Sequence, residues 1–189
     1  MVDACIYAAP CGPDEAWNAH MERFARLSPT LTVNHTDYVG LTFRPLLLSI
    51  ETKKHGIGGD RAELQMDAWL ASQWAFLHCS VARKLASVPQ QSFDAEDKTG
   101  SEDSADGEMC AAALLALRFL PGIIVQGHRW ALVISTYDPI TRQSQLWSDH
   151  QFGTTQDLLE TYATVAGVRR LMAWARDVYL PWLREHVMD

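Results

Sequence analysis

Residues 46–53 read LLLSIETK, an apolar run that ends in a carboxylate and an amine two positions apart. Side chains alternate between the two faces of a β-strand, so Glu51 and Lys53 are expected on one face and Thr52 on the other. Opposite charges at the end of an apolar strand indicate that this face borders a cleft. A solvated strand end with a surface ion pair is the alternative interpretation of the same residues.

The segments around this strand predict further helices and strands. Apolar spacing of three and four residues predicts helices over residues 14–27, 60–86 and 155–180, and a short helix or buried connector over 111–119. Alternation predicts strands over residues 30–33, 37–43, 123–137 (interrupted at Gly127) and 144–148. The short connection at Arg44 and Pro45 predicts an antiparallel hairpin of 37–43 with 46–53. This order predicts an α/β protein with a small mixed sheet flanked by helices.

Length and composition favour one globular domain over residues 1–189, because nearly half of the residues are hydrophobic. No apolar run approaches the roughly 20 residues of a membrane span, and the first ten residues lack the basic start of a secretory signal. An intracellular protein without a membrane partner is therefore expected. The four cysteines form no CxxC pair, which favours free thiols over a zinc site.

The net charge of −7 is unevenly distributed. Residues 92–108 hold seven acidic residues and one lysine, and so account for six of these seven negative charges. Residues 88–109 are rich in Pro, Gln, Ser, Asp and Glu, which predicts a mobile acidic loop. The remaining body is close to neutral and lacks the basic stripe of a tight nonspecific nucleic-acid binder.

An ordered set of polar residues surrounds the opening stretch. Asp37, Glu51, Lys53 and Gln65 follow the pattern D-x13-E-x-K-x11-Q, and Glu15 begins the helix before them. This arrangement resembles the PD-(D/E)xK superfamily with its restriction-endonuclease-like fold, in particular a large fungal set of nuclease-like proteins. Six segments look like that family in the same order: DEAWN (14–18), TDYVGL (36–41), IETKK (50–54), AELQMDAW (62–69), FLPGIIVQGHRW (119–130) and RRLMAWARDVYLPW (169–182).

The resemblance implies a divalent-metal-dependent phosphodiester hydrolase. Carboxylate oxygens of Asp37 and Glu51, with the backbone carbonyl of Thr52, would hold Mg²⁺ or Mn²⁺. Lys53 would orient the attacking water or stabilise the charge that develops on the phosphate. Two further residues would complete the catalytic set by resemblance, Glu15 from the first helix and Gln65 from the second.

Each of these residues also has an ordinary structural explanation. Asp37 could cap a turn, Glu15 suits a helix N-terminus, and Gln65 could be an exposed helix residue. Gln126 and His128, in the segment QGHRW, are candidate substrate contacts, although a histidine beside a tryptophan in a strand is usually structural.

Two other classes of function remain open. The same cleft could act on a small molecule by acid–base chemistry in a metabolite pathway, or the chain could be a catalytically silent binding domain. Nucleic acid is a possible partner that the charge does not favour.

Overall fold

The computed structural model describes residues 2–9, 15–54, 59–87 and 102–188. Its strands form one five-stranded sheet in the order β1-β2-β3-β4-β5. Strands β2 and β3 are parallel, and every other neighbouring pair is antiparallel, which confirms the predicted mixed sheet. The strands are β1 (Ala4–Tyr7), β2 (Leu46–Lys53), β3 (Leu120–Gln126), β4 (Arg129–Asp138) and β5 (Gln143–Thr154).

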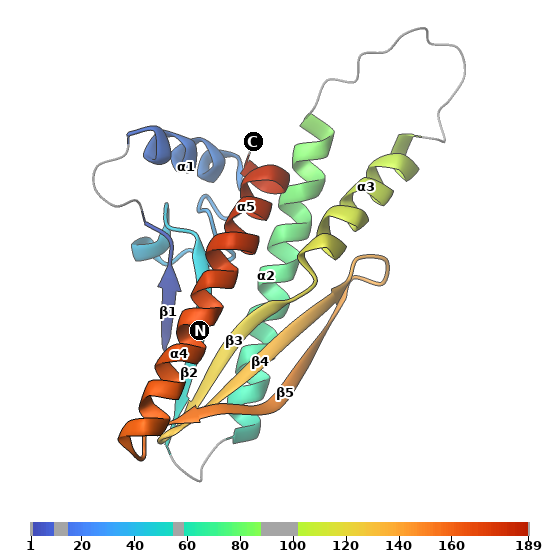
Figure 1. The fold of residues 1–189 in the computed structure, drawn as a ribbon. Helices are drawn as coiled ribbons and strands as arrows, with labels where there is room; N and C mark the ends of the chain where they lie inside the picture. The colour runs from blue at the N-terminus through green and yellow to red at the C-terminus, as the bar shows by residue number, and fades with distance from the viewer. Residues whose placement is uncertain (1, 10–14, 55–58, 88–101, 189) are drawn as a thin grey trace, which may run out of the picture.

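Helices cover the sheet on both faces, so the molecule has three layers (Figure 1). The long helix α2 packs on one face with α3 beside it, and the C-terminal helical segment crosses the other face. None of the described helices is long and apolar enough to cross a membrane. The helical elements are α1 (Glu15–Leu27), η1 (Val39–Leu41), α2 (Gly59–Ser87), α3 (Glu102–Leu117), α4 (Leu158–Trp174), η2 (Ala175–Tyr179), α5 (Leu180–Leu183) and η3 (Arg184–Met188).

Two indole hydrogen bonds fix α2 on its face of the sheet. Trp69 Nε1 donates to Ser49 Oγ of β2 at 2.8 Å, and Trp74 Nε1 donates to Ser135 Oγ of β4 at 3.2 Å. The face of α2 that contains Leu64, which is 68% exposed, therefore points to solvent. The buried side chains of α2 include Ala62, Met66, Leu70, Trp74, Leu77 and Val81.

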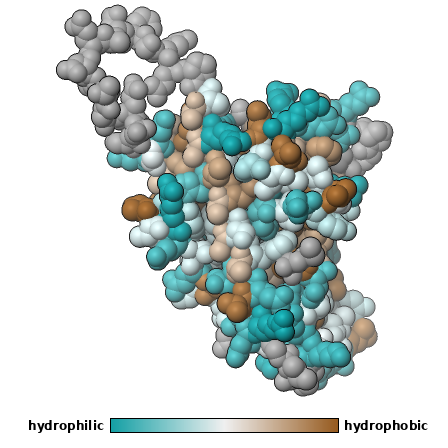
Figure 2. All heavy atoms as spheres, turned by 180° about the vertical axis from the view of Figure 1, so that it is seen from behind, coloured by the Kyte–Doolittle hydropathy of each residue, from teal (hydrophilic) through white to brown (hydrophobic). Residues whose placement is uncertain are grey.

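Seen from behind, the strongly hydrophobic residues among those coloured in Figure 2 stand singly between hydrophilic ones.

Helix α4 packs against the other face through two glycines. A Cβ atom at Gly153 of β5 would lie 2.9 Å from the backbone Cα of Thr164, and one at Gly167 would lie 2.5 Å from the Phe152 ring. Only glycine permits these close approaches. The helical segment continues past residue 180, where the sequence pattern predicted its end. Pro181 is accommodated because it lies in the first turn of α5, and π-helical turns precede and follow it.

Residues 28–45 form an irregular loop instead of the two predicted strands, 30–33 and 37–43. The buried side chain of Asn34 organises it. Asn34 Nδ2 donates to the carbonyl oxygens of Leu41 at 2.7 Å and Arg44 at 3.0 Å, and its Oδ1 accepts from the backbone N–H of Leu46 at 2.8 Å. These bonds replace the pairing of a hairpin, so the antiparallel partner of β2 is β1, and the predicted hairpin is wrong.

Replacing Asn34 tests this arrangement. Asn34→Ala is expected to lower the free energy of unfolding by about 2 to 3 kcal/mol, because buried backbone groups of the loop lose their partner. Chemical denaturation measures the change. Thr42→Ala, at a half-buried position of the same loop where the hydroxyl donates to the Val39 carbonyl, is the control, and an equal effect of both changes would contradict the role of Asn34.

Two further predicted boundaries differ from the structure. Residues 123–137 do not form one interrupted strand: β3 and β4 are antiparallel and joined by a turn at Gly127, whose φ of 63° suits glycine. Of the predicted acidic loop, residues 102–109 are the first half of α3, while residues 88–101 lie outside the described residues. The helices over 15–27 and 59–87 confirm the two predictions that were made from apolar spacing.

Candidate functional site

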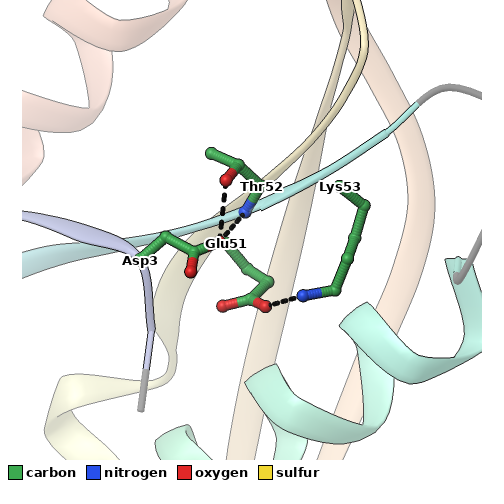
Figure 3. A network of polar contacts seen from close by, with 4 residues as sticks. All are labelled: Asp3, Glu51, Thr52 and Lys53. Carbon is green, nitrogen blue, oxygen red and sulfur yellow. Dashed lines mark hydrogen bonds and ion pairs between the residues drawn. The ribbon is translucent and has the colours of Figure 1, made fainter.

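Strand β2 carries the central residue of the site, Glu51, between β1 and β3 and on the face that α2 covers. Its side chain is 0% exposed, and Lys53 Nζ donates to its Oε1 (Figure 3). Its second oxygen, Oε2, is buried and has no hydrogen-bond partner among the described residues. A buried carboxylate with one uncompensated oxygen costs folding free energy, so this atom suits a bound cation.

A second carboxylate, Asp3, lies at the same end of the sheet. Asp3 directly precedes β1, whose Ala4 pairs with Ile50, the residue before Glu51. Its Oδ2 accepts hydrogen bonds from Thr52, at 2.7 Å from the hydroxyl and 2.8 Å from the backbone N–H (Figure 3). The hydrogen bond from the Thr52 hydroxyl lowers the pKa of Asp3 most. The bond from the Thr52 backbone N–H and the nearby charge of Lys53 lower this pKa further, so the Asp3 carboxylate stays ionised.

A polar pocket opens on the same face of the sheet. The register pairs Glu51 with Ile124 and Lys53 with Gln126, so Gln126 lies beside the lysine and is brought to the site. Ile124 and Gln126 line this pocket of about 170 Å³ together with Glu63 of α2 and Arg129 of β4. The Arg129 guanidinium is oriented by Gln151, whose Oε1 accepts from Arg129 Nε at 2.8 Å.

The four other predicted site residues lie on different elements of the structure. Asp37 is exposed in the loop before η1, not on a strand that pairs with β2. Glu15 is the exposed first residue of α1, which lies near the other end of the sheet from the end of β2 (Figure 1). Gln65 is half-buried on α2, and His128 is in the β3–β4 turn, where its carbonyl oxygen accepts from the Thr155 N–H.

The predicted catalytic and substrate roles of these residues remain predictions. So does the metal-ligand role of the Thr52 carbonyl. Within the described residues, no three His, Cys, Asp or Glu side chains lie close enough to hold a metal ion between them. Among the described residues, carboxylates at this end of the sheet include those of Asp3 and Glu51, and Glu63 borders the adjacent pocket.

Sequence reasoning missed Asp3. The usable signal was an acidic residue directly before a short strand-like segment, ACIY, near the start of the sequence. The expected hairpin of 37–43 with 46–53 assigned the place beside β2 to residues 37–43, whereas β1, which Asp3 directly precedes, occupies that place.

A second pocket, of about 320 Å³, lies on the β1 side of the site. Asp3 and Cys5 line it from the N-terminal segment, Tyr38 from the loop and Trp69 from α2. His35 packs edge-on against Trp69, with ring centroids 4.4 Å apart. Burial lowers the pKa of His35 to about 4, and its Nε2 has no partner among the described residues, so the ring is neutral at pH 7.

The low pKa of His35 predicts a pH-dependent stability. The unfolded chain, where the histidine has its ordinary pKa near 6.5, binds more protons than the folded chain between pH 6.5 and about 4. The contribution of His35 to the free energy of unfolding is therefore largest above pH 6.5. It decreases toward pH 4, by up to about 3 kcal/mol. Unfolding of wild type and His35→Phe at several pH values measures the difference, and parallel pH profiles would contradict the assignment.

With the geometry described, comparison with known proteins identifies the family. The family model described as the PD-(D/E)XK nuclease superfamily matches residues 1–180, so the chain belongs to this superfamily. The mixed α/β fold agrees with that membership, and the predicted fold class is confirmed. No curated protein and no solved structure gives a significant match.

Proposed function

We propose that the chain is a divalent-metal-dependent hydrolase of phosphodiesters that acts through Asp3, Glu51 and Lys53. The observation that supports this proposal best is the Glu51 carboxylate, which is fully buried, paired with Lys53 through one oxygen and without a partner at the other in the described part of the chain. Membership of the nuclease superfamily makes the same chemistry the expected one.

The residues present fit a magnesium ion. Mg²⁺ is commonly held by one or two carboxylates together with water and substrate phosphate oxygens. Glu51 Oε2 and the Asp3 carboxylate would supply the protein ligands. When bound, the ion would polarise the phosphate and lower the pKa of a water molecule.

The remaining residues act on the substrate and the attacking water. Lys53 lies on the same face as Glu51, where its ammonium group would stabilise negative charge that develops on the phosphate oxygens. Arg129 and Gln126 would bind neighbouring phosphate groups in the adjacent pocket, because a guanidinium pairs with phosphate through two parallel hydrogen bonds. The burial of Glu51 limits water around the reacting groups and strengthens these interactions.

Replacement of the carboxylates tests the proposal and separates Asp3 from Asp37. Glu51→Gln and Asp3→Asn are each expected to lower the rate of Mg²⁺- or Mn²⁺-dependent cleavage of labelled DNA or RNA by at least about a hundredfold. Asp37→Asn is expected to retain cleavage. Loss of activity in Asp37→Asn with retention in Asp3→Asn would overturn the assignment, provided that thermal unfolding shows all three variants folded.

A second candidate is hydrolysis of a small phosphodiester on the same residues. It is favoured by the size of the pocket beside Lys53, about 170 Å³, which is small for a duplex. Hydrolysis of bis(4-nitrophenyl) phosphate that depends on Glu51, without cleavage of any nucleic acid, would support it. Metal binding without hydrolysis of either substrate would leave a catalytically silent binding domain.

A further inference from the structure

A basic pocket lies at the far end of α2 from the candidate site. Helix α1, the last turns of α2 and η3 surround a cavity of about 270 Å³, near the end of the chain (Figure 1). Glu63 borders the pocket beside Glu51, and Arg83 borders this one. At 1.5 Å per residue along the helix, the two are separated by about 30 Å, so this cavity is not part of the catalytic cleft.

The charged side chains among the described lining residues of the cavity are basic. Arg23 from α1 and Arg83 and Lys84 from α2 line the cavity with His20, and no acidic residue is among those lining residues that the structure describes. This is unusual in a chain of net charge −7. Lys84 already donates to the carbonyl oxygen of Glu185, and it also suits the C-terminal end of α2. In the described structure, the exposed Arg23 and Arg83 have no hydrogen-bond or ion-pair partner.

Part of the lining of the cavity is apolar. Phe24 and Leu27 of α1 contribute to it, as do Val187 and Met188 of η3. Its volume of about 270 Å³ is more than a bare phosphate ion needs. The ligand that suits it therefore combines an anionic group with a compact apolar group.

We propose that this cavity binds a phosphate monoester that carries a small apolar or aromatic group. Two guanidinium groups and an ammonium group favour a doubly charged anion over a carboxylate, and each guanidinium can pair with phosphate oxygens through two hydrogen bonds. The apolar lining residues bury the organic part of the ligand, which favours the phosphate monoester over inorganic phosphate.

Calorimetric titration with phenyl phosphate tests the site on the full chain. Wild type is expected to bind phenyl phosphate at one site, more tightly than inorganic phosphate or benzoate. Arg23→Gln and Arg83→Gln are each expected to weaken binding by about tenfold to a hundredfold. Arg26→Gln is the matched control, because Arg26 is exposed on the same helix, pairs with Glu22 and does not line the cavity.

Two further measurements sharpen the result. Arg83→Lys keeps the charge but loses the bidentate geometry, so its affinity should fall between those of wild type and Arg83→Gln. Vesicles that contain phosphatidic acid present the same phosphate monoester on a lipid. Sedimentation with these vesicles that requires Arg23 and Arg83 would identify a lipid as the source of the group, whereas binding of phenyl phosphate alone would identify a soluble ligand.

Several outcomes would overturn the proposal. They are the absence of saturable binding, binding that is unchanged in both Arg→Gln variants, and an equal loss in Arg26→Gln, which would indicate a nonspecific effect of net charge. Arg23 and Arg83 are exposed, so their variants should melt at the wild-type temperature. The result does not depend on hydrolase activity, because binding is the only readout.

Discussion

Lys53→Met is expected to lower the free energy of unfolding by about 3 to 5 kcal/mol in metal-free buffer at neutral pH. The change leaves the Glu51 carboxylate fully buried with neither oxygen compensated by a described residue, because Lys53 donates to Oε1 and no described residue bonds to Oε2. Removing one member of a buried ion pair is much more costly than removing both, since the remaining charge stays desolvated. Urea denaturation followed by circular dichroism measures the loss.

Two controls isolate the buried charge. The double variant Glu51→Gln/Lys53→Met should recover much of the lost stability, because no charge remains in the interior. Lys54→Met, at the neighbouring exposed position, should change stability by no more than about 0.5 kcal/mol. Magnesium should stabilise Lys53→Met more than it stabilises the double variant. If the single and double variants are equally unstable, Lys53 does not compensate Glu51.

Trp74→Ala is expected to destabilise the fold by about 3 to 5 kcal/mol. Trp74 is 1% exposed between α2 and the sheet, stacks on Tyr137 with ring centroids 5.2 Å apart, and donates to the buried hydroxyl of Ser135. Its removal leaves a large cavity and an unpaired hydroxyl in the layer that holds α2 on the sheet.

Trp147 provides the matched control for the same chemical change. Its side chain on β5 is 55% exposed, and its indole donates to Thr136 at the surface. Trp147→Ala should therefore cost less than about 1 kcal/mol. Equal losses for the two tryptophans in thermal or urea unfolding would contradict the role of Trp74 as a buried contact between α2 and the sheet.

Local sequence patterns were sufficient for the strongest elements. The strand at residues 46–53 and the helices over 15–27 and 59–87 are formed as expected, because their apolar periodicity is strong and uninterrupted. The alternation in DYVGLTF at 37–43 looked equally like a strand. There, the three hydrogen bonds of Asn34 hold an irregular loop in place, and no local pattern shows that a side chain will satisfy backbone groups at a distance.

The face that each helix buries was also beyond the sequence. Helix α2 has apolar or small residues on more than one face, and the indole bonds of Trp69 and Trp74 to serines of the sheet decide which face is buried. In α4, the apolar residues Leu158, Tyr162 and Val165 follow helical spacing, yet they are 73%, 66% and 51% exposed. The close approaches at Gly153 and Gly167 set the orientation of this helix instead.

The sequence by itself determined that Glu51 and Lys53 share one face of a strand, because the period of two is a property of the extended backbone. It also determined the α/β fold class, because the apolar patterns of helices and strands follow one another along the chain. Only the tertiary structure decided that Glu51 is buried with one oxygen uncompensated, and that Asp3 is the acidic residue nearby. Burial and strand pairing depend on which distant segments come to lie beside β2, and that choice minimises the free energy of the whole chain, not of any one segment.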